Sequence, residues 1–447
     1  MRTVLEPQTQ IPVYDEADVL VVGGGPAGSA AAISAARNGA KVILLERYGF
    51  LGGLVTGGQV CMIPNLDNGT GDKVLGIQKE WMTRLGKYPD AVFGPKDREA
   101  GSTNSELVKK WSNYFGTVWN NRVMYTTFID PELMKIVLND MVEEAKVTVY
   151  FHCWAAKAFM DEGTLKGVFF ESKEGRKAIL AKVVIDATGE GDIFASAGAE
   201  FDNSIDPTIR NSNMAECFRL ANTDYAKYAA YKTAFPEECA RKLQCLNETA
   251  GYKLLPIPSN RNDNMWVNNW IPERNSMKIQ DLTYVEMKIK KAIPDVVRYL
   301  QKELPGFEDC YLMDIASVVG CRYSRRLKGQ YQITFDDLKQ GKTFSDSIAV
   351  TPAMHSFNKP DGEAALSIPF RALVPEKLDN LLAAGRCLSA DVRAHNWLNL
   401  IPHSVATGEA SGAAAYLAVQ SGKKPRDIDI DKLQKILRNQ GVYLPEI

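Results

Sequence analysis

The chain has 447 residues, a length that allows two or three domains. Hydrophobic residues make up 45% of it, charged residues 24%, and the formal net charge is −1, as in an ordinary globular protein with a large core. Because the charge is so nearly balanced, we expect neither nucleic acid nor an anionic membrane surface as a partner.

The N-terminal residues contain no apolar segment typical of a secretory signal, and no uninterrupted run of about 18 apolar residues predicts a membrane helix. The eight cysteines include no Cys-x-x-Cys pair, which argues against a disulfide framework, a zinc ribbon or an iron–sulfur cluster. We therefore predict reduced thiols that are mostly buried, no metal site, no membrane partner and a cytoplasmic location.

The first predicted unit is a strand, a helix and a second strand. The run "ADVLVV" (Ala17–Val22) is short and apolar, as in a buried parallel sheet. A helix of small residues is expected over Ala27–Asn38, with Gly39 as its natural stop. The run "KVILLE" (Lys41–Glu46) completes this βαβ unit.

The turn between the first strand and the helix carries the pattern Gly23-x-Gly25-x-x-Gly28, and an acidic residue, Glu46, follows 18 positions after Gly28. In this context the pattern predicts a dinucleotide site. Gly23 permits the tight turn, Gly25 lets the backbone approach a pyrophosphate, and Gly28 allows close packing of helix on strand. The helix N-terminus offers unpaired N–H groups, and Glu46 can accept hydrogen bonds from a ribose.

A second glycine cluster follows at once, in "ERYGFLGGLVTGG" (Glu46–Gly58). One glycine-rich turn is enough for a pyrophosphate, so this cluster needs another explanation. We expect Gly52 and Gly53 to let the backbone run close to the rest of a long cofactor, where a Cβ would collide. The pair Gly57-Gly58 would then turn the chain towards the substrate.

Residues 65–125 are expected to form excursion loops with a helix or two. A helix over Asp130–Ala145 follows, with Asp130 as N-cap and Pro131 in the first turn. Short β-branched runs between residues 147 and 189 predict an antiparallel meander that interrupts a last parallel strand. That strand ends in "DATGEGD" (Asp186–Asp192).

The amino-acid composition changes near residue 203, where tyrosines and tryptophans become frequent. An amphipathic helix is predicted over Thr283–Leu300. A strand ending in glycine (Leu378–Ser389) and an alanine-rich helix opened by glycine (Ser404–Gly422) come later. We therefore predict a first part of a cofactor domain at residues 1–202, a substrate or cap domain at 203–365, a return segment at 366–422 and a tail at 423–447.

Three features favour FAD over NAD as the cofactor. Only one GxGxxG pattern exists, so separate FAD and NAD(P)H domains are not both expected. The small residues of "DATGEGD" suit a backbone that passes close to an adenosine diphosphate. Late in the chain, a strand ends in "LLAAGR" (Leu381–Arg386) and is followed by the Gly408 helix. This segment can hold the ribityl chain and the flavin.

With these motifs in view, the chain resembles the broad family of FAD-dependent oxidoreductases. They are single-Rossmann flavoproteins related to the flavin part of heterodisulfide reductase and, more distantly, to fumarate reductase. The resemblance lies in "DVLVVGGGPAGSAAAISAARNGAKVILLERYGFLGG", "DATGEGD", "PGFED", "VGCRYSRRLKGQY", "IPFRALVPEKLDNLLAAGRCLSA" and "ATGEASG".

The resemblance implies an α/β protein with a Rossmann-like FAD-binding domain of the glutathione-reductase type, βαβ with an antiparallel meander, and an inserted α+β substrate domain. The implied FAD-binding residues are Gly23, Gly25, Pro26, Ala27, Gly28, Glu46, Arg47, Gly52, Gly53, Thr56, Ala187, Thr188, Gly189, Asp192, Gly385, Arg386 and Gly408. The chain departs from many relatives at Asn396, where they carry glycine, and at His403, which leaves the substrate open.

Flavin chemistry needs groups that move protons and control charge. Among the four histidines, His395 and His403 lie in the segment expected near the flavin, and His355 lies in the return from the second domain. Arg322 and Arg325 belong to a basic cluster that can bind a carboxylate or stabilise a developing oxyanion. For the three histidines the competing interpretation is a role in packing. For the two arginines it is a set of salt bridges between the domains.

The leading functional hypothesis is hydride transfer between a small polar or anionic organic substrate and flavin N5. The alternatives are a flavin monooxygenase or halogenase, and a non-catalytic flavin-bearing electron-transfer subunit. The sequence leaves open the direction of the reaction, the electron acceptor or donor, covalent attachment of the flavin, and whether the protein is a homo-oligomer.

Overall fold

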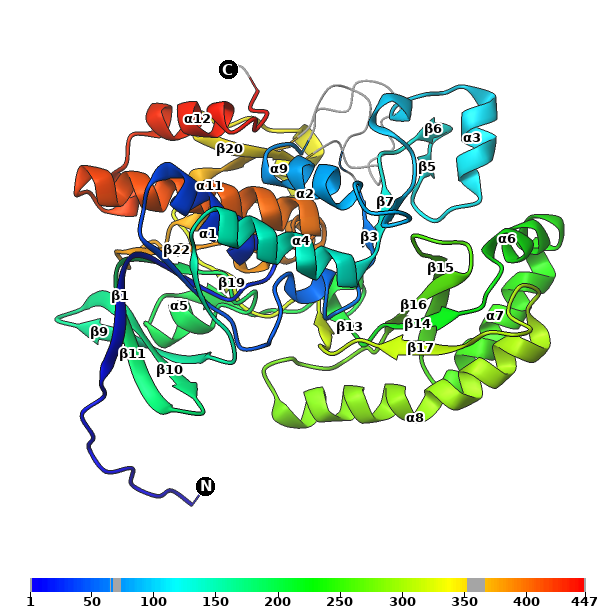
Figure 1. Cartoon of the computed structure of the whole chain (residues 1–447), viewed down its shortest axis with the longest axis horizontal. Coiled ribbons are helices and arrows are strands. Elements are labelled where there is room, and N and C mark those ends of the chain that lie inside the picture. The colour runs from blue at the N-terminus through cyan, green and yellow to red at the C-terminus, as the bar shows by residue number, and fades with distance from the viewer. Residues whose placement is uncertain (1, 65, 67–73, 352–365, 446–447) are drawn as a thin grey trace.

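The computed structural model describes residues 2–64, 66, 74–351 and 366–445. Two sheets organise it (Figure 1). The first contains β1, β2 and β11 and is covered by helices α1, α4 and α11, while the second contains β14–β17 and lies above the long helix α8.

The first sheet has the predicted parallel centre. In spatial order its strands are β8 (Thr148–Tyr150), β2 (Val42–Leu45), β1 (Val13–Val22), β11 (Gly175–Asp186), β10 (Thr164–Ser172) and β9 (Trp154–Asp161), and β22 (Leu381–Ala383) also pairs with β11. The pairs among β8, β2, β1, β11 and β22 are parallel, whereas β9, β10 and β11 pair antiparallel. The predicted βαβ unit and meander are confirmed.

Side chains alternate between the two faces of β1 and sort into two cores. Val19 and Val21 pack with the helices α1 (Pro26–Asn38), α4 (Pro131–Glu144) and α11 (Ile401–Ser421). Leu20 and Val22 pack on the other face, against the meander and α5 (Asp192–Ser196). This period of two follows from the pleat of a strand, and it explains why the strand is apolar on both faces.

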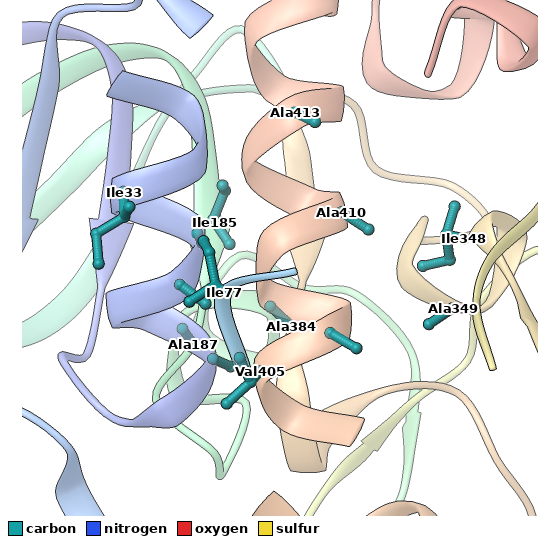
Figure 2. Close-up of a cluster of buried hydrophobic side chains, with 14 of the residues drawn as sticks. Ile33, Ile77, Ile185, Ala187, Ile348, Ala349, Ala384, Val405, Ala410 and Ala413 are labelled. Atoms are coloured by element: carbon teal, nitrogen blue, oxygen red, sulfur yellow. The ribbon is translucent and has the colours of Figure 1, made fainter. Parts of the chain in front are cut away.

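Helices α1 and α11 approach so closely that only glycine fits at the contact. A Cβ added to Gly408 would lie 2.1 Å from the carbonyl oxygen of Ala27, and one added to Gly412 would lie 2.2 Å from that of Ala31. Figure 2 shows side chains of α11, including Val405 and Ala410, in the core beside α1. The prediction that Gly408 opens this helix is wrong, because α11 begins at Ile401 and Gly408 lies inside it.

The second sheet is antiparallel and has its own core. Its strands, in order, are β15 (Lys253–Pro258), β16 (Asn264–Trp270), β14 (Phe218–Ala221) and β17 (Tyr311–Ile315). The apolar face of α8 (Ile279–Glu303) packs on it together with α6 (Tyr225–Ala234) and α7 (Pro236–Ala250). The predicted amphipathic helix is thus present, and Phe218 and Ile289 are completely buried between the two layers.

The remaining segments mostly return to the first core. Ile333 and Ile348 belong to it, as do Leu433 and Leu437 of α12 (Ile430–Asn439). Figure 2 shows Ile348 and Ala349 on the side of α11 opposite to α1. We therefore propose that the chain re-enters the first domain before Ile333 and that the tail is part of it.

The other helices are α2 (Ile77–Leu85), α3 (Ser105–Ser112), α9 (Phe335–Gln340) and α10 (Val392–Leu398). The short strands are β3 (Met62–Ile63), β4 (Val92–Phe93), β5 (Val118–Trp119), β6 (Arg122–Val123), β7 (Thr127–Ile129), β12 (Phe201–Asp202), β13 (Met214–Ala215), β18 (Gly320–Cys321), β19 (Arg326–Leu327), β20 (Ser347–Thr351) and β21 (Leu366–Pro369). Within the described ranges, no helix is both long and apolar enough to cross a membrane.

Candidate active site

A cavity of about 500 Å³ joins the two parts of the molecule. Its size lies within the range of about 300–1,000 Å³ that is usual for small-molecule sites. One end is formed at the carboxyl ends of β1, β2, β11 and β22, where an open α/β sheet binds its ligands. The other end is formed by residues of the second sheet and of the segments around it.

The glycine turn after β1 has the geometry of a dinucleotide site. Gly23 has a φ of 95°, and its N–H donates to the carbonyl of Leu45 at 2.8 Å. A Cβ added to Gly28 would lie 1.7 Å from the carbonyl oxygen of Gly23, so this glycine is required for packing and does not line the cavity. Gly25 lines the cavity, and a Cβ there would meet no atom within 4 Å. The bare backbone at Gly25 therefore faces the space in which a pyrophosphate would lie.

Glu46 lies on the cavity wall and is only 5% exposed. Its Oε2 accepts the N–H of Gly24 at 2.7 Å, and its Oε1 accepts the N–H of Tyr48 at 2.8 Å. Burial raises the pKa of this carboxyl, although the two backbone hydrogen bonds oppose the shift. Glu46 thus shapes the glycine turn, and the lone pairs that its two oxygen atoms keep could accept hydrogen bonds from a ribose.

The second glycine cluster packs against the first. The N–H of Gly52 donates to the carbonyl of Gly24 at 2.8 Å, and a Cβ on Gly53 would lie 3.0 Å from the Cα of Gly25. Of the two glycines predicted to bind FAD, Gly53 lines the cavity and Gly52 lies behind it. Thr56 is fully buried and donates to the carbonyl of Leu51 at 2.5 Å, so it shapes the loop without lining the cavity.

Gly57 connects this loop to the second part of the chain. Its carbonyl accepts the N–H of Ser317 at 2.8 Å, and a Cβ would overlap the ring of Phe50, 2.2 Å from the nearest ring atom. The loop therefore does reach the segment that lines the far end of the cavity, through Val318 and Val319.

The end of β11 is held by a buried carboxylate. Asp186 accepts the N–H groups of Ile193 and Phe194, each at 2.9 Å, and the hydroxyl of Thr188 at 2.7 Å. Burial raises the pKa of Asp186 to about 6. This network fixes the turn whose members Ala187, Thr188, Gly189 and Asp192 line the cavity.

The late segment contributes Gly385 and Arg386, which also line the cavity. Gly385 has a φ of 80°, and its N–H donates to the hydroxyl of Thr407 at 3.1 Å. Nη1 of Arg386 and Oε1 of Glu190 lie 4.0 Å apart, and neither has a hydrogen-bond partner among the described residues. Polar atoms left unpaired beside the glycine turns fit a site built for a polar cofactor.

Thirteen of the predicted cofactor residues therefore line one cavity: Gly23, Gly25, Pro26, Ala27, Glu46, Arg47, Gly53, Ala187, Thr188, Gly189, Asp192, Gly385 and Arg386. Gly28, Gly52, Thr56 and Gly408 lie behind its wall, where they allow close packing or shape a loop.

The predicted catalytic histidines are not on the cavity wall. His395 is buried in α10, with Nε2 2.7 Å from the carbonyl oxygen of Arg386, and burial lowers its pKa to about 3. His403 is fully buried in α11, with Nδ1 3.2 Å from the carbonyl oxygen of Trp397, and burial lowers its pKa to about 4. Both pack inside the fold as neutral rings. His355 lies outside the described residues.

The two predicted arginines have different positions. Arg322 lines the far end of the cavity, and its guanidinium lies 5.6 Å from the ring centre of Trp270. Arg325 does not line the cavity, because it is bound to the carboxylate of Asp192 at 2.9 Å and to the carbonyl of Glu190 at 3.0 Å. Arg325 thus supports the wall from behind.

Sequence reasoning missed Arg210, which lines the cavity beside Asn399. Its Nη2 donates to Oδ1 of Asn399 at 2.7 Å and to the carbonyl of Asn396. No motif surrounds Arg210 in the sequence, so nothing local marks it. The Arg-Asn contact joins residues 189 positions apart, and only the fold brings them together.

The family model described as "FAD dependent oxidoreductase" matches residues 18–437 of this chain. The protein therefore belongs to the FAD-dependent oxidoreductase family, and it is an enzyme that uses FAD. The residues that line the cavity beside the glycine turns are those that would hold this cofactor.

Two curated relatives are digeranylgeranylglycerophospholipid reductases 1 and 2 of Methanopyrus kandleri. The first is 30% identical over 41% of this chain and 42% of its own length, and the second is 28% identical over 48% of each chain. The matched part of this chain thus spans less than half the length of either relative.

Among solved structures, the chain is similar to a geranylgeranyl bacteriochlorophyll reductase-like protein of Thermoplasma acidophilum, with 14% identity, a TM-score of 0.46, and coverage of 95% of this chain and 84% of the other. It is also similar to the myxobacterial FAD-dependent halogenase CndH, with 12% identity, a TM-score of 0.45, and coverage of 95% and 79%. At these values neither similarity bears on the reaction.

Proposed function

We propose that the protein transfers a hydride between a small polar or anionic organic substrate and N5 of FAD. One observation carries this proposal: a single cavity runs from the glycine turn at Gly25 to a chamber walled by Trp266, Trp270 and Arg322. FAD bound at the first end would supply the hydride chemistry.

The residues of the far chamber can hold and orient a substrate. Trp266 is 3% exposed and, with Trp270, provides an apolar wall that excludes water. Asn268 and Asn399 lie on the same wall and carry amides that can donate or accept hydrogen bonds. Arg322 adds a fixed positive charge that can bind or polarise an oxygen of the substrate.

A second candidate is the reduction of a carbon–carbon double bond in an apolar chain, suggested by the names of the curated relatives. It is favoured by an apolar stretch of the same wall, formed by Val60, Met62, Pro64, Phe115 and Val118. A flavin monooxygenase or halogenase also stays open, whereas a non-catalytic subunit does not agree with the enzyme family.

The candidates separate in anaerobic spectroscopy of the FAD-loaded protein. We would mix the oxidised holoenzyme with a panel of hydroxy acids, and the reduced holoenzyme with oxo acids, unsaturated acids and isoprenoid alcohols, and follow the flavin absorbance. Hydride transfer with a small acid predicts bleaching or reoxidation within seconds. Reoxidation by isoprenoids alone would favour the second candidate. In a separate aerobic assay, NADPH-dependent oxygen uptake would favour a monooxygenase.

A further inference from the structure

Arg210 and Arg322 differ from the arginines around them in having no acidic partner. Among the described residues, neither forms an ion pair with a carboxylate. Three neighbouring arginines of the same region are all paired: Arg219 with Asp314, Arg325 with Asp192 and Arg326 with Asp202. The two exceptions are the two that line the far end of the cavity.

Neutral groups hold both guanidinium groups in place. Arg322 donates to the carbonyl of Asn213 at 3.0 Å, to Oδ1 of Asn268 at 3.1 Å and to the carbonyl of Asn269 at 3.3 Å. Arg210 donates to Oδ1 of Asn399 at 2.7 Å. These acceptors orient the two side chains without neutralising them.

One side chain connects the pair. The amide of Asn399 accepts from Arg210 through its oxygen and donates through its nitrogen to the carbonyl of Arg322 at 2.9 Å. The amide therefore fixes Arg210 relative to the backbone of Arg322. Two cations held this way are preorganised, because their positions do not depend on a ligand.

The acidic residues on the cavity wall do not compensate this charge. In the part of the chain that the structure describes, they are Glu46, Glu190 and Asp192, all at the dinucleotide end, and Asp192 is already bound by Arg325. Burial lowers the pKa of Arg210, and the neighbouring charge of Arg322 acts in the same direction. An uncompensated pair of partly buried cations is costly unless an anion joins it.

We propose that Arg210 and Arg322 together form an anion subsite that binds the carboxylate of an organic acid substrate, whose apolar body packs against Trp266 and Trp270. Guanidinium groups match the planar geometry of a carboxylate, and a dry aromatic wall strengthens the contact. This inference rests on the proposed function and names its substrate class. A phosphate ester shares the same oxyanion chemistry, so the experiment includes one.

The test is calorimetric titration of the FAD-loaded protein with benzoate, with its neutral counterpart benzamide and with phenyl phosphate. We expect benzoate to bind about 10- to 100-fold more tightly than benzamide, the range expected when charge-assisted hydrogen bonds are gained. We also expect benzoate to bind more tightly than phenyl phosphate. Equal binding of benzoate and benzamide would overturn the subsite, and preference for phenyl phosphate would overturn the carboxylate.

Variants assign the effect to the two side chains. Arg210→Met and Arg322→Met should each abolish the preference for benzoate while leaving benzamide binding and FAD content unchanged, and Arg322→Lys should keep part of it. Lys253→Met is the matched control, because its ammonium lies 5.5 Å from the ring centre of Trp270 but does not line the cavity. This control should bind benzoate like the parent protein.

Two further outcomes distinguish a failure of the anion subsite from a failure of the proposed hydride reaction. In the first, both Met variants lose FAD, and the holoenzyme that remains still prefers benzoate. This result would mean that the two arginines bind the cofactor, and it would overturn the proposal. The other outcome is a benzoate preference that depends on both arginines, while no organic acid reduces or reoxidises the flavin. This result would support the subsite and refute the hydride reaction.

Discussion

The carboxylate of Glu46 accepts the N–H of Gly24 with 2.7 Å between the two heavy atoms. The hydrogen bond ties the end of β2 to the glycine turn after β1, so the residue expected to bind a ribose also fixes the turn expected to bind the pyrophosphate. The two halves of the dinucleotide site are therefore coupled through one side chain.

This coupling predicts the effect of Glu46→Gln. The amide keeps one acceptor oxygen, so it can bind either Gly24 or Tyr48 but not both, and it presents less charge to a ribose. We expect FAD affinity to fall by about 10- to 100-fold, as for the loss of one charge-assisted hydrogen bond. Fluorescence titration of the apoprotein with FAD measures it. Glu216→Gln, at a buried glutamate between β13 and β14, should bind FAD normally. An unchanged affinity in Glu46→Gln would show that the coupling has no consequence for the cofactor.

Gly53→Val tests the second glycine cluster. Gly53 has a φ of 50° and lies against Gly25, so a β-branched side chain would be strained and would press the cofactor turn. We expect FAD affinity to drop by about 10- to 100-fold through this overpacking.

Gly163→Val supplies the control for backbone strain. Gly163 also has a positive φ, of 75°, but a Cβ there would meet nothing within 4 Å. Both variants should lose stability from the backbone conformation, and only Gly53→Val should lose FAD. If the two variants bind FAD equally well, the role of Gly53 beside the cofactor is refuted.

The contrast between these glycines and the histidines explains what the sequence could predict. The predicted dinucleotide site is made of residues close together in one βαβ unit, so local spacing determines its geometry, and Gly25 and Glu46 line the same cavity. The far chamber is made of side chains from distant segments, such as Arg210 and Asn399, which no local pattern connects.

The segment that contains His395 and His403 lies next to predicted FAD-binding residues in the sequence, but proximity along the chain does not determine which face a side chain occupies. His403 is in the first turn of α11, where the helix turns that side chain into the core. Gly408 was misplaced for a related reason. A glycine-rich, alanine-rich run can mark either a helix start or a close helix–helix contact, and only the three-dimensional packing distinguishes the two.

Gly408→Ala tests that packing. One added methyl group would lie 2.1 Å from the carbonyl oxygen of Ala27, so α1 and α11 must separate or shift. We expect a loss of about 1–3 kcal/mol in the free energy of unfolding, as for an overpacked core. Urea unfolding followed by circular dichroism measures the loss. Gly86→Ala is the milder comparison, because φ there is −65° and a Cβ would lie 3.1 Å from the carbonyl oxygen of Met82 instead of 2.1 Å from a carbonyl oxygen; it should lose less stability than Gly408→Ala. Equal losses in the two variants would contradict the close contact.

Glu409 gives the last prediction, on the pH dependence of stability. It lies in α11, is 1% exposed, and its Oε2 accepts the N–H of Ile77 at 2.9 Å. Burial raises its pKa to about 8, well above the ordinary value of 4.5. Between these two values the folded protein holds a proton that the unfolded chain releases. Stability from this group is thus fully present below about pH 4.5 and is lost as the pH rises towards 8.

Glu409→Gln replaces the carboxyl with a group that stays neutral. We expect the melting temperature of the variant, relative to the parent protein, to increase steadily from pH 5 to pH 8, because only the parent carries a proton in the fold that its unfolded chain releases. Differential scanning fluorimetry of the holoenzymes at matched ionic strength measures this difference. Glu144→Gln is the control, since Glu144 is exposed, its pKa is lowered by the hydrogen bond to Arg84, and it is ionised throughout this range. The melting temperature of Glu144→Gln should therefore depend on pH as that of the parent protein does. If the melting temperature of Glu409→Gln also runs parallel to that of the parent, Glu409 is already ionised in the fold, with Ile77 and solvent stabilising its charge.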